Sequence, residues 1–115
     1  MDYKKDIREK FTDVLYNALK RIKNSNIEYS KVGLFGSFAR GTMSLGSDID
    51  IALFYSEKPE LYDVSILRYD LEEIGCDLVV LPIEAFNNPS SRLEENIKKD
   101  FMEVSLWREL LDIMR

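Results

Sequence analysis

Three aspartates stand at the starts of predicted strands, and their spacing suits metal and phosphate chemistry. Asp48 and Asp50 are separated by one residue, so on a strand their side chains point to one face, with Cα atoms about 7 Å apart. Asp77 stands directly before a second apolar run at residues 78–81. Carboxylates this close repel one another, and the natural compensation is Mg²⁺ held by oxygen ligands, as one ion or as two about 3.5 to 4 Å apart. The spacing therefore predicts a metal site that binds a phosphate chain.

A Gly-Ser pair at residues 36–37 adds what is needed to hold phosphate. Gly36 lets a phosphate approach the backbone, and Ser37 offers a hydroxyl at a position where a short helix could begin. Arg40 lies close by in the sequence and adds positive charge. Metal-holding acids that face a phosphate cradle are the parts needed for in-line attack at phosphorus. Because the chain has no His, Asp77 is the candidate base.

Each of these features also has a simpler interpretation. Taken alone, Gly36-Ser37 is typical of an ordinary turn with a Ser cap, and Asp77 is typical of a turn residue before a strand. Arg40 is equally well explained as a surface charge. A solvated strand edge explains the Asp-x-Asp pair poorly, because the rest of that strand is Ile, Ala, Leu and Phe. The convergence of the acids with the Gly-Ser turn therefore favours a functional site.

Composition excludes several classes of protein. The chain has 115 residues, which is enough for one compact domain over residues 1–115 and too few for two. Sixteen Lys and Arg against 21 Asp and Glu give a net charge of −5, which argues against direct nucleic-acid binding and favours a basic partner. The absence of His excludes His-based acid–base catalysis and His-ligated zinc.

Cysteine use and hydropathy predict a cytoplasmic protein. Cys76 is the single cysteine, so it cannot form an internal disulfide, and we expect it to be a small buried apolar group. No apolar run approaches the roughly 20 residues of a membrane span, and the charged first residues do not resemble a signal peptide. We therefore expect no membrane association.

Apolar periodicity predicts the elements that position these residues. Helical spacing indicates an amphipathic helix of about 20 residues that ends at residues 24–26, and a second helix after Pro59 that ends before Gly75. A capping-box pattern at residues 91–94 starts a third, short helix. Strand patterns fall at residues 32–35, 48–54 and 78–81, with a further short strand from residue 102. Residues 37–47 are expected to be a loop with one helical turn at most.

The order of these elements brings the marked residues together. The connection between the second and third strands contains a helix, so these two strands should be parallel, with both acid-bearing starts at one end of the sheet. If the first two strands pair antiparallel, the end of the first strand, with Gly36 and Ser37, reaches the same end. The marked positions then converge on one edge.

The motifs resemble the signature of the minimal nucleotidyltransferase (MNT) family of the DNA polymerase β superfamily. They are Gly36-Ser37-Phe38-Ala39-Arg40-Gly41 and Ser47-Asp48-Ile49-Asp50. Ten residues separate Ser37 from Asp48, and 26 separate Asp50 from Asp77, which fits that pattern and its third acidic strand. The resemblance covers residues 5–106, and its motif is specific because composition, spacing and strand context agree.

The resemblance implies an α+β nucleotidyltransferase fold, a small mixed β-sheet flanked by helices with an α-β-α-β-α-β core. It implies transfer of a nucleoside monophosphate, AMP from ATP, to a hydroxyl with release of pyrophosphate, and Mg²⁺, as two ions, at the three acids. The implied roles are phosphate binding by Gly36 and Ser37, metal binding by Asp48, Asp50 and Asp77, assistance by Asp77 in deprotonation, and nucleotide binding by Arg40 and Ser47.

The resemblance also implies a biological setting. Small MNT proteins are often antitoxins paired with helical HEPN ribonuclease toxins, which some of them adenylylate on tyrosine. One alternative is a non-catalytic nucleotide-binding antitoxin that neutralises a toxin by occlusion. Another is transfer to a small molecule such as an aminoglycoside, although those enzymes usually carry an added domain. The last residues carry an apolar stripe, which is formed by Trp107, Leu110, Leu111 and Met114. This stripe predicts a terminal helix at residues 107–115 that contacts a partner or a second copy of the chain.

Overall fold

The centre of the protein is a four-stranded mixed β-sheet. The computed structural model describes the backbone of residues 3–42, 46 and 48–104, and side chains from residue 11 onward. The strands lie in the order β3-β2-β1-β4, with bounds β1 (Lys31–Phe35), β2 (Ile49–Tyr55), β3 (Cys76–Pro82) and β4 (Met102–Glu103). β1 pairs antiparallel with both β2 and β4, whereas β2 and β3 are parallel. The predicted parallel direction of β2 and β3 is therefore confirmed, and the antiparallel pairing of β1 and β2, which the predicted convergence required, is present.

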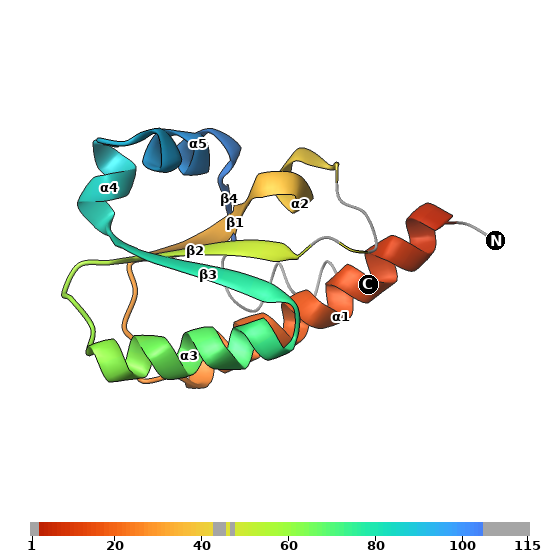
Figure 1. Ribbon diagram of the computed structural model, residues 1–115, viewed down its shortest axis with the longest axis horizontal. Coiled ribbons are helices and arrows are strands. Elements are labelled where there is room, and N and C mark those ends of the chain that lie inside the picture. Colours follow the sequence, from red (N-terminus) through yellow and green to blue (C-terminus); the bar gives the residue numbers. More distant parts are fainter. Residues whose placement is uncertain (1–2, 43–45, 47, 105–115) are drawn as a thin grey trace.

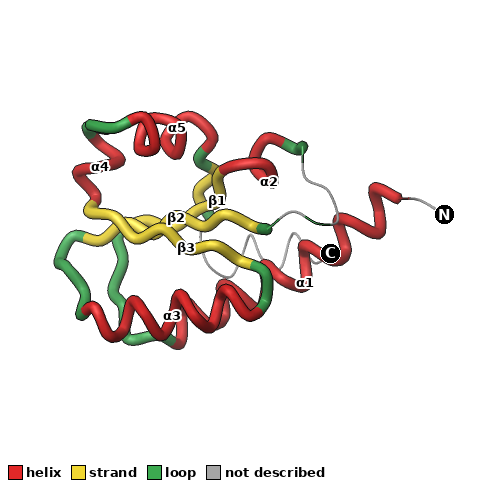
Figure 2. Tube along the Cα trace, viewed as in Figure 1, coloured by secondary structure: helices red, strands yellow, loops and turns green. Residues whose placement is uncertain are grey.

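Helices cover the two faces of this sheet. Figure 1 and Figure 2 show α1 (Tyr3–Asn24) and α3 (Leu61–Glu73) on one face, with α4 (Ile83–Asn87) and α5 (Arg92–Asp100) on the other. The short α2 (Gly36–Arg40) follows directly from β1 on the same side as α5. α3 is the crossover between β2 and β3, which is why these strands run parallel. The predicted α+β sheet flanked by helices is confirmed.

The sheet separates two apolar cores of different size. On one face, Ile49, Ile51 and Leu53 pack with the apolar stripes of α1 and α3. On the other face, Ala52 and Phe54 pack with the smaller α4 and α5 layer, where the Phe86 and Phe101 rings meet edge to face at 5.1 Å. Residues 51–54 of β2 are therefore buried on both faces of the sheet, as expected for a central strand.

Several element boundaries differ from the sequence-based expectation. The strand predicted at 48–54 begins at Ile49, so Asp48 precedes it, and the strand predicted at 78–81 extends over Cys76–Pro82. α2 is the short helical turn that the prediction allowed in the loop segment, although it begins at Gly36, and α4 lies in a segment without a predicted helix. Both helices have five residues, which is too short for a periodic apolar stripe to reveal them.

The predicted third helix and the last strand are present. Ser91 caps α5, because its hydroxyl accepts a hydrogen bond from Glu94 N at 3.1 Å. The Glu94 carboxylate accepts from the backbone of Ser90, one residue earlier than the capping box requires. The predicted terminal helix at 107–115 lies outside the described residues. Among the helices of the described part of the chain, none is long and apolar enough to cross a membrane.

Candidate functional site

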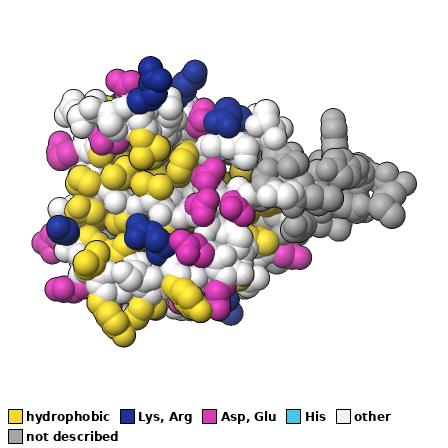
Figure 3. All heavy atoms as spheres, viewed as in Figure 1, with side chains coloured by type: hydrophobic (Ala, Val, Ile, Leu, Met, Phe, Trp, Pro, Cys, Tyr) yellow, Lys and Arg dark blue, Asp and Glu magenta, His cyan; other side chains and the backbone are white. Residues whose placement is uncertain are grey.

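Two of the predicted acids lie side by side where β2 and β3 begin. Asp50 and Asp77 are direct partners in the parallel register, so their side chains share one face of the sheet. Asp48 stands two residues before Asp50, just ahead of β2, and Ile49 N donates to Gly75 O at 3.0 Å, which keeps the two strand starts aligned. Figure 3 shows acidic side chains gathered near the middle of the face viewed, around the starts of β2 and β3.

Gly36 brings the end of β1 against the same acids. Phe35, the last residue of β1, is the register partner of Asp50. Gly36 follows with φ +74, a conformation that favours glycine, and a Cβ placed there would overlap Asp50 Oδ2 and lie 3.1 Å from Asp50 Cγ. Only a residue without a side chain lets this carboxylate lie so close to the backbone. The predicted convergence of the Gly-Ser turn with the acid pair is therefore present.

The electrostatics of the site centre on Asp50. Partial burial raises the pKa of Asp50, and the negative charges of Asp77 and Asp48 raise it further, while the nearby Arg40 charge acts in the opposite direction. The Cys76 thiol behind this edge is buried, as predicted, and burial followed by the charges of Asp48 and Asp77 raises its pKa to about 12. A partly buried carboxylate with two negative neighbours is an environment that a cation stabilises.

The oxygen donors fit a hard cation in their chemistry. Carboxylates are the ligands that Mg²⁺ takes in proteins, and Asp50 meets two further carboxylates at this edge. As the side chains stand, the described residues contain no group of three Cys, Asp or Glu arranged to hold a metal ion. The structure therefore brings the predicted donors to one edge without closing them around one point.

Two further predicted nucleotide-binding residues, Ser37 and Arg40, lie on α2. Phe38 packs edge to face on Phe11 of α1 with ring centroids 5.6 Å apart, which anchors α2 beside the sheet. The Ser37 carbonyl accepts from Thr42 N at 2.9 Å as α2 ends, and within the described part of the chain the Ser37 hydroxyl has no hydrogen-bond partner. The predicted Ser47 lies outside the described residues.

Arg40, in the last turn of α2, pairs with a residue that the sequence did not indicate. Its Nη1 donates to Asp100 Oδ2 at 2.6 Å, and Asp100 is the last residue of α5. The two residues are 60 positions apart in the chain. Asp100 belongs to no motif and its neighbours in sequence are ordinary helix residues, so no sequence signal pointed to it.

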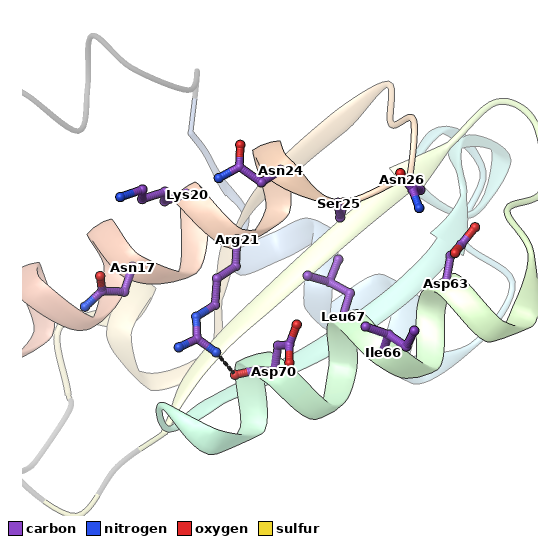
Figure 4. A pocket seen from close by; sticks show the side chains of 10 residues that line it. All are labelled: Asn17, Lys20, Arg21, Asn24, Ser25, Asn26, Asp63, Ile66, Leu67 and Asp70. Carbon is purple, nitrogen blue, oxygen red and sulfur yellow. Dashed lines mark hydrogen bonds between the residues drawn. The ribbon is translucent and has the colours of Figure 1, made fainter.

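A separate groove of about 480 Å³ lies between α1 and α3. Figure 4 shows that Arg21 crosses this groove and donates to the Asp70 carbonyl, at 2.8 Å. Its lining residues include none of the predicted site residues. α1 and α3 lie on the face of the sheet opposite α5, so this groove is no part of the acid site (Figure 1).

This fold, with adjacent acids facing a Gly-Ser turn, defines a nucleotidyltransferase domain. Residues 17–107 match the profile of the family described as polymerase beta, nucleotidyltransferase. The chain belongs to that family and is therefore a nucleotidyltransferase. This match confirms the resemblance seen in the sequence. A protein of Methanocaldococcus jannaschii, provisionally named a protein adenylyltransferase, is 33% identical over 75 residues, which are 64% of this chain and 77% of that protein.

Solved structures share the fold. A toxin–antitoxin crystal structure with AMP-PNP has a TM-score of 0.60 at 19% identity, over 86% of this chain and 83% of that chain. A Sulfolobus solfataricus structure, provisionally described as a nucleotidyltransferase, also has a TM-score of 0.60 at 19% identity, over 95% of this chain and 91% of that chain. At this level of identity, the likeness concerns the fold.

Proposed function

We propose that this chain transfers AMP from ATP to a hydroxyl group of a partner protein, a tyrosine of a HEPN-type toxin, and thereby acts as an antitoxin in the cytoplasm. The observation that carries this proposal is the contact of Gly36 with Asp50, which brings the Gly-Ser turn against the paired carboxylates of Asp50 and Asp77. The named activity of the archaeal relative supports a protein as the acceptor. The net charge of −5 suits a basic partner.

The reaction that these residues serve is an in-line displacement at the α-phosphorus. The acceptor oxygen forms a bond to the α-phosphorus as the bond from that phosphorus to the oxygen bridging the α- and β-phosphates breaks, and pyrophosphate leaves. Gly36 lets the phosphates approach the backbone, while the Ser37 hydroxyl and the Arg40 guanidinium bind phosphate oxygens. The Asp77 carboxylate takes the proton of the acceptor hydroxyl.

Asp48, Asp50 and Asp77 would hold Mg²⁺, as two ions. When bound, Mg²⁺ neutralises charge on the phosphates and orients them for displacement. The raised pKa of Asp50 is consistent with this role, because its causes are burial and two neighbouring negative charges. Ser47 completes the proposed nucleotide-binding set.

Transfer of label separates catalysis from neutralisation by binding alone. The chain is incubated with Mg²⁺ and ATP labelled at the α-phosphate, together with its copurified partner, and the partner is examined for label. We expect label on a partner tyrosine with the wild-type chain and none with Asp48→Asn. If the partner is neutralised without acquiring label, the non-catalytic antitoxin is the correct function and the proposal is wrong.

A further inference from the structure

The ion pair between Arg40 and Asp100 connects the candidate site to the helical layer above the sheet. Arg40 Nη1 lies 2.6 Å from Asp100 Oδ2, a short charge-assisted hydrogen bond. The two ends differ in environment, because 53% of the Arg40 side chain is exposed and only 14% of the Asp100 side chain is. The carboxylate is thus the fixed member of the pair, and the guanidinium reaches it from the surface.

Helix stability does not explain an acid at position 100. Asp100 is the last residue of α5, where the helix macrodipole disfavours negative charge. Lys98 and Lys99 in the same turn have the favourable sign. Burial of most of the Asp100 side chain adds a desolvation penalty that a partner must offset. The feature that favours a carboxylate at this position is Arg40.

The geometry also leaves most of the Arg40 fork for a ligand. Asp100 is the hydrogen-bond partner that the described residues give this guanidinium, and it engages one nitrogen, Nη1. Arg40 ends the same short helix whose first residue, Gly36, lies against Asp50. Its positive charge is also felt at Asp50, where it acts against the raised pKa. A planar guanidinium that is held at one nitrogen can still donate its other N–H groups to a second anion.

We propose that Asp100 is a positioning residue, which fixes the Arg40 guanidinium at the edge of the site so that its remaining N–H groups bind a phosphate of the nucleotide. This role rests on the proposed function, since it requires a nucleoside triphosphate beside Asp50. Asp100 itself does not touch the nucleotide. It acts by holding an otherwise mobile side chain in one orientation, which lowers the entropy lost when the phosphate binds.

The sign of the effect distinguishes positioning from general electrostatics. Removing a negative charge near an anionic ligand should tighten binding, because it removes repulsion. If Asp100 positions Arg40, removing its charge should instead weaken binding. Glu95→Gln is the matched control, because it removes the same charge from an exposed position of the same helix.

The experiment compares the wild-type chain with Asp100→Asn, Asp100→Glu, Arg40→Ala, the double variant Asp100→Asn/Arg40→Ala and Glu95→Gln. Calorimetry gives the affinity for AMP-PNP with Mg²⁺, steady-state transfer gives KM for ATP and kcat separately, and thermal unfolding gives stability. We expect Asp100→Asn to weaken nucleotide affinity and raise KM by about tenfold, with kcat within about threefold of wild type. Asp100→Glu should restore most of the affinity, and Glu95→Gln should bind as wild type or more tightly.

The double variant tests whether the two residues act as one unit. If Asp100 acts through Arg40, the double variant should bind no more weakly than Arg40→Ala alone. Wild-type affinity and KM in Asp100→Asn, even with a lowered melting temperature, would overturn the positioning role and leave the proposed function intact. Failure of the wild-type chain to bind AMP-PNP would overturn the proposed function, and with it the role of Asp100.

Discussion

Replacing Gly36 with Ala tests the contact on which the candidate site is built. The residue has φ +74, where an L side chain costs about 1 to 2 kcal/mol of folding stability. Each kcal/mol lost lowers the melting temperature of a small domain by about 4 to 8 °C. The new Cβ would also overlap Asp50 Oδ2 and lie 3.1 Å from Asp50 Cγ. The carboxylate must then move by on the order of 1 Å, a displacement that costs about 100-fold in rate when it misplaces a catalytic group.

Gly41→Ala separates backbone strain from displacement of the carboxylate. Gly41 has the same φ of +74, but a Cβ there would meet no atom of the described residues within 4 Å. Both variants should therefore lose stability in thermal unfolding, while only Gly36→Ala should lose about 100-fold in metal-dependent transfer. The reasoning is refuted if the two variants, compared at temperatures where both are folded, transfer the nucleotide at the same rate.

Four further outcomes follow from individual contacts. Asp50→Asn should abolish transfer and raise the free energy of unfolding at neutral pH. Because folding raises the pKa of Asp50, the wild type regains stability as the pH falls through that pKa towards 3.8, so denaturant titrations should show the advantage of the variant shrinking in acid. Gly33→Ala should destabilise the fold by about 1 to 3 kcal/mol in thermal unfolding, because its Cβ would lie 2.5 Å from a β4 carbonyl oxygen; an unchanged melting temperature would contradict this packing. The Cys76 thiol, buried and with a pKa of about 12, should resist alkylation until denaturant is added, and rapid reaction in the native protein would refute its burial. Ser91→Ala should cost about 1 kcal/mol of stability through loss of the α5 cap, measured by denaturant unfolding.

The sequence predicted the elements whose signal is periodic or chemical. α1 and α3 carry apolar stripes long enough to fix both their type and their length, and the Ser91 cap marks the start of α5. The parallel direction of β2 and β3 follows from the helix between them. The antiparallel pairing of β1 with β2 stayed conditional, because a connection with one short helix permits more than one arrangement.

The residues of the candidate site likewise include some that the sequence predicts and some that it does not. Asp50, Asp77 and Gly36 were predicted because strand order and register alone bring them to one edge. The Arg40 to Asp100 pair was not, because it depends on how α5 packs over α2 across 60 residues of sequence. A contact between two side chains on separate helices leaves no periodic trace in a single chain, so tertiary packing must be known first.

The two cores of unequal size divide the protein into parts of different local stability. β2 and β3 share the larger core with α1 and α3, whereas α4 and α5 close only the smaller one. Subglobal opening begins where the least apolar surface is lost, so amide protons of α4 and α5 should exchange before those of the central strands. The carboxylates of Asp50 and Asp77 would then keep their register while α5 opens. Asp100 would move away with α5 and release Arg40. Opening of this helical layer would therefore free the Arg40 side chain while the strands that carry Asp50 and Asp77 stay paired.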